Sequence, residues 1–211
     1  MSGTSLESDR YWYDPQKGHG LAHDPLGSII APRPIGWIST HDGAGHRNLA
    51  PYSFFNLFNY RPPIIGFASL GSKDTLRNAE KTGEFVWNLV TRDLTERMNA
   101  TSATVSSDTD EFHLAELTSA PSANIAAPRV AGSPVNLECR LSQIVALRDA
   151  SGGTLSTWLI LGEVVGVHIA HRLLRKGLYD TAAAAPVLRG GGRTDYFQIQ
   201  RDALFRMPQP D

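Results

Sequence analysis

The stretch that decides the fold is a strict alternation of apolar and polar side chains, Val135-Asn136-Leu137-Glu138-Cys139-Arg140-Leu141-Ser142. Side chains along a strand point alternately to its two faces. The pattern therefore predicts a strand with one buried and one exposed face.

Outward from this stretch, apolar and aromatic runs predict further strands. They cover 35–40, 48–58, 64–69, 84–90, 158–169 and 196–199, with a shorter extended piece at 28–31. Helices are expected at 74–82, 94–103 and 110–117, the first capped by Asp74 or Thr75 and ended by Gly83. Alternating strand–helix units of about 30 residues are absent, which disfavours a doubly wound parallel sheet. The prediction is a mainly β chain whose few short helices lie at the rim of an antiparallel barrel.

Charge and composition exclude several classes of function. The 211 residues carry 20 Lys and Arg against 21 Asp and Glu, a net charge of −1. A nearly neutral chain has no general electrostatic attraction to nucleic acid or to an anionic membrane. No apolar run approaches the ~18 residues of a membrane span, and the first residues lack the apolar core of a signal peptide. We therefore expect a cytoplasmic protein that binds neither nucleic acid nor a membrane.

Cysteine and histidine usage predicts no metal site. The single cysteine, Cys139, excludes an internal disulfide and an all-cysteine site, and its place on an apolar strand face indicates an inert buried thiol. His19 and His23 have the spacing of a helical pair of ligands. Gly18 and Gly20 disfavour a helix there.

The segment Ser69-Leu70-Gly71-Ser72-Lys73-Asp74-Thr75 joins a predicted strand to a predicted helix. Free backbone N–H groups and the positive end of the helix dipole converge at such a place. Ser69 and Thr75 add hydroxyl donors, and Lys73 adds a full positive charge. This chemistry suits a phosphate group; the alternative is an ordinary capped helix with a surface lysine.

A second segment, Asn48 to Asn56, mixes polar and aromatic side chains. A flat heteroaromatic ligand needs apolar faces to bury it and a few donors and acceptors to bind its edge. The alternative is an aromatic core strand with polar ends.

His168 and a glycine-rich segment are further candidates. His168 shares a predicted strand with Gly162 and Gly166, which would let a planar ligand approach the backbone, although a core histidine with a satisfied hydrogen bond is the alternative. Arg189-Gly190-Gly191-Gly192-Arg193 could cover a ligand or simply connect two strands. No Gly-x-Gly-x-x-Gly follows a strand, so a Rossmann site for NAD is not indicated.

In this order, the segments together resemble the flavin reductase-like family with an FMN-binding split barrel, the group that includes flavoredoxin. The matching pieces are PRPIGWIST at 32–40, NLAPYSFFN at 48–56, PP at 62–63, KDT at 73–75, Asn78, TGEF at 82–85, NLV at 88–90, DEF at 110–112, SPV at 133–135, LEC at 137–139, GEVV at 162–165 and His168. They extend over roughly residues 25 to 200.

The resemblance implies a homodimer of six-stranded antiparallel split β-barrels with Greek-key connections, holding FMN at the dimer interface. Carried over to this sequence, it implies that Ser69, Lys73 and Thr75 hold the phosphate together with Arg33. It further implies that the isoalloxazine ring meets Asn48, Leu49, Ala50 and Ser53, with Trp37 and His168 near it. His168 is the residue expected to act in catalysis, by positioning a nicotinamide or tuning the flavin.

The activity implied is that of an FMN-dependent NAD(P)H oxidoreductase, a flavin reductase that could serve a two-component monooxygenase. The alternative is a flavoredoxin-like electron carrier without its own NAD(P)H site. Gly162-Glu163-Val164 replaces the Gly-Asp-His of stand-alone NAD(P)H:flavin reductases, and Arg189-Gly190-Gly191-Gly192 replaces the family's Arg-Leu-Gly-Gly. The expected organisation is an arm at 1–27, the flavin reductase-like domain at 28–200 and a tail at 201–211.

Overall fold

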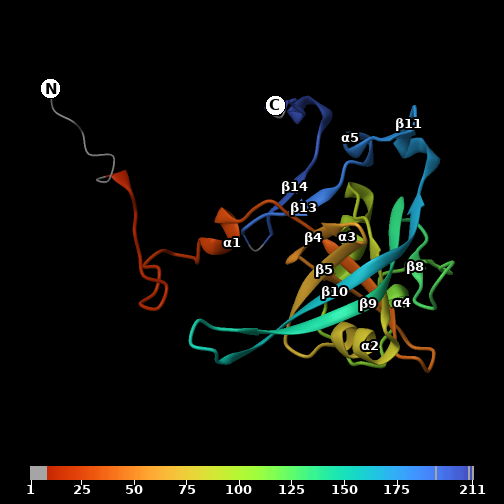
Figure 1. Cartoon of the computed structure of the whole chain (residues 1–211), viewed down its shortest axis with the longest axis horizontal. Coiled ribbons are helices and arrows are strands. Elements are labelled where there is room, and N and C mark those ends of the chain that lie inside the picture. Colours follow the sequence, from red (N-terminus) through yellow and green to blue (C-terminus); the bar gives the residue numbers. More distant parts are fainter. Residues whose placement is uncertain (1–8, 193, 209, 211) are drawn as a thin grey trace.

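The centre of the fold is an antiparallel sheet of seven strands (Figure 1). The strands are β2 (Gly36–His41), β3 (Arg47–Tyr52), β4 (Phe55–Tyr60), β5 (Pro63–Leu70), β6 (Glu84–Asn88), β9 (Val135–Arg148) and β10 (Thr154–Ile169). Their order in the sheet is β3-β2-β6-β9-β10-β5-β4. The computed structural model describes residues 9–192, 194–208 and 210. The predicted mainly β class is confirmed.

The strand count differs from the six that the resemblance implies. The predicted strand over 48–58 divides into β3 and β4, because the chain bends at Ser53 and Phe54. These two strands form opposite edges of the sheet. No hydrogen-bonded ladder between described residues joins the two edges, so the expected closure is not seen in the strand pairing.

Short elements surround the sheet. A three-stranded sheet contains β1 (Arg33–Pro34), β13 (Val187–Arg189) and β14 (Tyr196–Gln198). Two pairs are β7 (Ser119–Ala120) with β8 (Arg129–Val130), and β11 (Leu174–Arg175) with β12 (Leu178–Tyr179). The helices are α1 (Leu26–Ile29), α2 (Asp74–Thr82), α3 (Thr95–Ala100), α4 (Glu111–Leu114) and α5 (Thr181–Ala184), with 3-10 turns η2 (Arg92–Leu94), η3 (His171–Leu173) and η4 (Arg201–Ala203).

Two local predictions are wrong. The segment 28–31 was expected to be extended, but it begins inside α1, because the N–H groups of Ser28 and Ile29 donate to the carbonyl of Pro25. The predicted cap of α2, Asp74 or Thr75, already lies inside the helix, and Lys73 is the capping residue. The predicted end is confirmed: Gly83 adopts a φ of 74°, a left-handed conformation that glycine reaches without steric cost.

Three buried apolar clusters form among the described residues, and two of them bear on the site. Inside the curve of the sheet, Ile38, Phe67, Phe85, Cys139 and Ile160 belong to one buried cluster. Burial raises the pKa of the Cys139 thiol, which keeps the sulfur protonated, as expected for an inert core thiol.

The second core lies on the outer face of the sheet. It includes Trp37 and Leu49 from the strands, Met98 from α3 and Phe112 from α4. This packing fixes α3 and α4 beside β3. The segment after α3 and the start of α4 therefore lie near the edge of the sheet.

The N-terminal segment leaves the sheet through α1 and extends well away from it (Figure 1). Residues 1–8 of the predicted arm, and 209 and 211 of the predicted tail, lie outside the described residues. Among the described residues, no helix is long and apolar enough to cross a membrane.

Candidate functional site

A groove of about 390 Å³ lies beside the edge strand β3, where α2 begins. Four parts of the chain form it: β3, the start of α2, the hydroxyl-rich segment 101–105 after α3, and Glu111 at the start of α4. The volume falls within the ~300–1,000 Å³ of small-molecule sites. Polar groups dominate the walls, so the groove suits a ligand with several hydrogen-bonding atoms.

The first turn of α2 presents unused donors to this groove. Lys73 precedes the helix and gives it no side-chain cap. No acceptor among the described residues takes the backbone N–H groups of Asp74 and Thr75. With the Lys73 side chain in the lining, the start of the helix is a cradle for an anion.

Tyr52 supplies an independent sign of a ligand. Only 7% of the residue is exposed, and its hydroxyl has no hydrogen-bond partner among the described residues. The hydroxyls of Ser69 and Thr75 lie near enough to lower its pKa, although neither forms a hydrogen bond to it. Burial raises the pKa of Tyr52, so the group remains a neutral hydroxyl that can donate. Leaving such a group unpaired is costly, and Tyr52 belongs to the lining of the groove, so its hydroxyl is a candidate donor to a ligand bound there.

Asn48 and Thr75 connect β3 to the helix start. The Asn48 amide nitrogen donates to Thr75 Oγ1 over 2.9 Å. Since Thr75 Oγ1 accepts this bond, its own proton is left to donate elsewhere. The Thr75 hydroxyl can therefore serve a bound anion from the same side as Tyr52.

Glu111 closes the groove beside β3. Its Oε2 accepts the backbone N–H of Leu49 over 3.0 Å, and the residue is buried. Burial raises the pKa of this carboxyl, and the charges of Asp74 and Asp110 act in the same direction, while the Leu49 N–H opposes the shift. The bond also shows that the N–H of Leu49 points away from β2, toward the open edge of the sheet.

A second hollow of about 270 Å³ shares Pro51, Tyr52 and Ser102 with the groove. Ser53, Asn99, Arg189 and Tyr196 are among its other lining residues. The Arg189 guanidinium lies 4.8 Å from the ring centroid of Tyr196. The two hollows form a continuous site along β3, with the anion cradle in one part and an aromatic–cation pair in the other.

The structure brings five of the ten predicted site residues to these hollows. Asn48, Ala50, Lys73 and Thr75 line the groove, and Ser53 lines the second hollow. Ser69 lies behind Tyr52 and donates to the carbonyl of Gly71.

Leu49 and Trp37 lie behind the lining. The Leu49 side chain is in the outer core and only its backbone reaches the groove edge. Trp37 donates from Nε1 to Thr101 Oγ1 over 3.0 Å, and it thereby supports the segment 101–105.

Arg33 does not reach the anion cradle. Its guanidinium donates to the carbonyls of Gly27, Ile30 and Gly190. The side chain ties the α1 region to the end of β13, so the structure gives it a different environment from the one expected.

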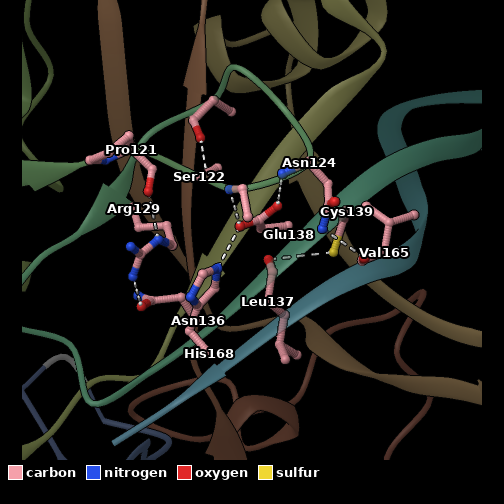
Figure 2. Close-up of polar contacts among 12 residues, drawn as sticks. Pro121, Ser122, Asn124, Arg129, Asn136, Leu137, Glu138, Cys139, Val165 and His168 are labelled. Carbon is pink, nitrogen blue, oxygen red and sulfur yellow. Dashed lines mark hydrogen bonds and ion pairs between the residues drawn. The ribbon is translucent and has the colours of Figure 1, made fainter.

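His168 lies outside the groove of its own chain. Its Nε2 is 2.5 Å from Glu138 Oε1, and Glu138 also accepts the N–H groups of Ala123 and Asn124, each over 2.7 Å. Figure 2 shows this cluster beneath the loop that carries Ser122 and Asn124. His168 pairs with Asn136, which pairs with Asn88, which pairs with Trp37, which pairs with Pro51 of β3. These are four steps between neighbouring strands, or roughly 19 Å measured along the sheet at ~4.8 Å a step.

A larger hollow of about 830 Å³ lies beside the C-terminal segment. Its lining is mostly apolar, and its carboxylate, Asp180, is already paired with Arg175 and Arg201. It has neither the uncapped helix nor the unpaired hydroxyl of the groove, so we place the candidate site at β3.

Sequence reasoning missed several lining residues. Tyr52 lies inside the quoted aromatic segment and could have been singled out as its one hydroxyl-bearing ring. The segment 101–105 contains Thr101, Ser102 and Thr104, a cluster of hydroxyls directly after a helix. Glu111 lies in the DEF piece that matched the family, but nothing marked it as a lining residue, because an acidic first residue is common in any helix.

The chain is similar to proteins of one known family. A family model described as flavin reductase like domain matches residues 28–187. The chain belongs to this family. A protein of Halalkalibacterium halodurans is 35% identical over 173 residues, covering 79% of this chain and 81% of the relative. A protein of Deinococcus radiodurans is 36% identical over 184 residues, covering 81% and 78%.

Solved structures agree with the family. Nitrilotriacetate monooxygenase component B from Bacillus cereus superposes with a TM-score of 0.80 at 29% identity, covering 89% of this chain and 98% of that one. A protein with a split barrel domain from Shewanella frigidimarina gives a TM-score of 0.78 at 26% identity, covering 88% and 90%. Flavoredoxin of Desulfovibrio vulgaris gives 0.75 at 20% identity, covering 90% and 95%, and shows the fold alone. The chain is a flavin reductase-like protein with the split-barrel fold.

Proposed function

We propose that the protein binds FMN in the groove at β3 and acts as an NAD(P)H-dependent flavin reductase. The observation that carries the proposal is the buried, unpaired hydroxyl of Tyr52 beside the uncapped start of α2. Family membership supports it, because the same region was implied by the resemblance to FMN-binding split barrels.

The groove fits a flavin phosphate by its own chemistry. The N–H groups of Asp74 and Thr75 and the Lys73 ammonium would hold the phosphate oxygens. Tyr52 and Thr75 would donate hydroxyl protons to the same group. Arg77 and Asp74 of the lining pair with each other, which leaves the Lys73 charge among the donors, and such a set matches a phosphate better than it matches a neutral ligand.

The edge of β3 would bind the polar edge of the ring. The N–H of Leu49 points away from β2, so its carbonyl and that of Pro51 point the same way. These acceptors would take a ring N–H, while Ala50 and Pro51 cover apolar surface and exclude water. When bound, the flavin supplies the hydride and electron transfer, so the chain needs no nucleophile of its own.

The catalytic role expected for His168 stays a prediction. Within one chain its Nε2 is committed to Glu138, and it lies on a different part of the sheet from the groove. We propose that it acts on a flavin only in the groove of a second chain.

A homodimer is part of the proposal. The edge strand β4 exposes Leu57, Phe58 and Tyr60, the last to 81%. Exposed apolar side chains on a sheet edge favour association. Sedimentation of the purified chain tests this: a monomer at micromolar concentration would contradict it.

The electron acceptor and the cellular setting are proposed from the relatives. The Bacillus cereus neighbour is a monooxygenase component, so we propose that reduced flavin passes to a monooxygenase in the cytoplasm. The domain limits 28–200, with an arm before and a tail after, are kept in this proposal.

One experiment tests the binding and another tests the electron donor. A purified protein that neither carries nor takes up FMN, by visible absorption and fluorescence quenching, would contradict the proposed function. Anaerobic stopped-flow mixing with NADH and NADPH should bleach the flavin bands with at least one donor. Failure with both would favour the alternative, an FMN electron carrier without an NAD(P)H site, which Gly162-Glu163-Val164 favours.

A further inference from the structure

The buried carboxyl of Glu111 has no role in the function proposed above. It is held at one place by the N–H of Leu49, which uses Oε2 alone. The residue belongs to the lining of the groove, and among the described residues only backbone N–H groups, those of Leu49 and of Glu111 itself, interact with the carboxyl; no side chain donates to it. A carboxyl oxygen fixed in a ligand groove, with capacity to spare, is available to bind a ligand.

The position of Glu111 relative to the anion cradle restricts what it can bind. Asn48 donates to Thr75 in the first turn of α2, and the next residue, Leu49, donates to Glu111. Glu111 is therefore the neighbour of the cradle along β3. It must meet the part of a ligand that is covalently next to its anionic group.

Charge excludes the anion itself as the partner of Glu111. The negative charges of Asp74 and Asp110 act on this carboxyl, and the cations Arg77 and Arg47 are paired with these two aspartates. A phosphate oxygen would add repulsion. A hydroxyl group can donate to the carboxylate, and it can also accept from the protonated acid, so it suits Glu111 in either state.

We propose that Glu111 is a specificity-determining residue that binds the hydroxyl groups of the polyol chain joining the phosphate to the ring. The inference rests on the proposed FMN function and adds to it the reason why a polyol phosphate is selected. It assigns three parts of the ligand to three parts of the site: phosphate to α2, polyol to Glu111, and ring to the remainder of the β3 edge.

Binding of three flavins to the full chain tests the assignment. FMN carries phosphate, polyol and ring, riboflavin lacks the phosphate, and lumiflavin lacks both phosphate and polyol. Glu111→Ala should weaken FMN and riboflavin by the same factor, about tenfold for one or two lost hydrogen bonds, and lumiflavin less than twofold. Fluorescence titration measures all three without any turnover.

A second variant protects the test against misfolding. Glu111→Gln keeps an oxygen for the Leu49 N–H and should weaken FMN and riboflavin by about threefold, with lumiflavin unchanged. Glu116→Ala, an exposed glutamate just beyond α4, is the matched control and should change none of the three.

The outcomes separate this inference from the proposed function. Equal weakening of lumiflavin would place Glu111 against the ring, and tighter FMN with unchanged riboflavin would show that Glu111 only repels the phosphate; either result overturns the inference alone. Unchanged binding of all three flavins in both variants also overturns it. A wild-type chain that binds no FMN overturns the proposed function and this inference together.

Discussion

Two buried glutamates, Glu111 and Glu138, show how a ligand site differs from a structural cluster in this fold. Glu138 is fully buried and accepts from Ala123, Asn124 and His168. Glu111 interacts only with backbone N–H groups, those of Leu49 and of Glu111 itself, has no side-chain donor among the described residues, and lines a groove. The hydrogen bonds of Glu138 hold a loop against the sheet. Glu111, whose hydrogen bonding is incomplete, lies in the same groove as the unpaired hydroxyl of Tyr52 and the uncapped start of α2. Incomplete hydrogen bonding, rather than the presence of histidine or glutamate, marks the site.

The largest expected effect comes from the structural side. Glu138→Ala would empty a fully buried side-chain site and remove the acceptor of the Ala123 and Asn124 N–H groups and of His168, so the free energy of unfolding should fall by about 3–5 kcal/mol. Urea unfolding measures it. Exposed Glu163 on β10 is the control, and its replacement by Ala should cost under about 0.5 kcal/mol.

Acid should act on the same cluster. Burial pushes the pKa of Glu138 up, but the hydrogen bonds from Ala123, His168 and Asn124 together hold it below its usual range. The stability it contributes is present above the unfolded pKa of about 4.3 and is lost as the pH falls through the lower folded pKa. A Glu138→Ala protein that unfolds at the same urea concentration as wild type would contradict the comparison.

The next effect belongs to the groove. Lys73→Ala should weaken FMN by about 10- to 150-fold, corresponding to about 1.5–3 kcal/mol, because a charge-assisted contact to the phosphate is lost. Unfolding should be unchanged, since the side chain caps nothing. Lys81→Ala, in the last turn of the same helix, controls for the loss of one charge; equal FMN affinity in both variants would place the phosphate elsewhere.

His168 sharpens the comparison, since it was expected at the flavin. His168→Ala removes one of three bonds to Glu138 and should lower the free energy of unfolding by about 1–2 kcal/mol, with FMN affinity within twofold of wild type. Urea unfolding and FMN titration on the same sample measure both. Loss of flavin reduction with normal FMN binding and normal stability would instead support action in a second chain.

Tyr52→Phe should give effects of opposite sign in the free and bound protein. Removing a buried hydroxyl that lacks a partner should leave the free chain as stable as wild type or raise its free energy of unfolding by up to about 1 kcal/mol. FMN should bind about fivefold more weakly, because a donor to the phosphate is gone. Thermal unfolding with and without FMN measures both; weaker stability with unchanged affinity would show that the hydroxyl is not a ligand contact.

The smallest effect is a pH dependence that runs opposite to that of Glu138. Burial raises the pKa of Glu111, so the folded chain holds this proton more tightly than the unfolded chain does. The stability it contributes is fully present below the unfolded pKa and is lost as the pH rises through the raised folded pKa. Glu111→Gln should therefore gain stability relative to wild type as the pH rises from about 4 to 7. A difference in melting temperature that stays constant over this range would contradict the assignment.

Sequence patterns predicted what local chemistry determines. The alternation from Val135 marked β9, and Gly83 marked the end of α2, because strand periodicity and left-handed glycine are properties of neighbouring residues. The junction of strand and helix at 69–75 was likewise predicted, whereas the binding of a phosphate there stays a prediction. The bend at Ser53 and Phe54 was missed, because neither position carries the glycine or proline that commonly marks a turn.

Contacts between distant residues could not be predicted in the same way. Glu138 and His168 are 30 residues apart, and only the register of β9 with β10 brings them together. The link from Glu111 to Leu49 spans 62 residues and depends on how α4 packs on the outer core. The sequence therefore showed which residues have functional side chains, but it did not show which hydrogen-bond partners those side chains meet in the fold.

The free edge of β3 has a consequence beyond ligand binding. An exposed strand edge is a template on which another chain can add a strand and begin a fibril. Here Glu111 occupies the Leu49 N–H, and two residues on, Pro51 has no N–H to offer. The carbonyl groups of β3 thus remain available to a small molecule, but the strand lacks the alternating N–H donors that an added strand would need. Glu111 and Pro51, which shape the groove, therefore also disfavour aggregation at this edge.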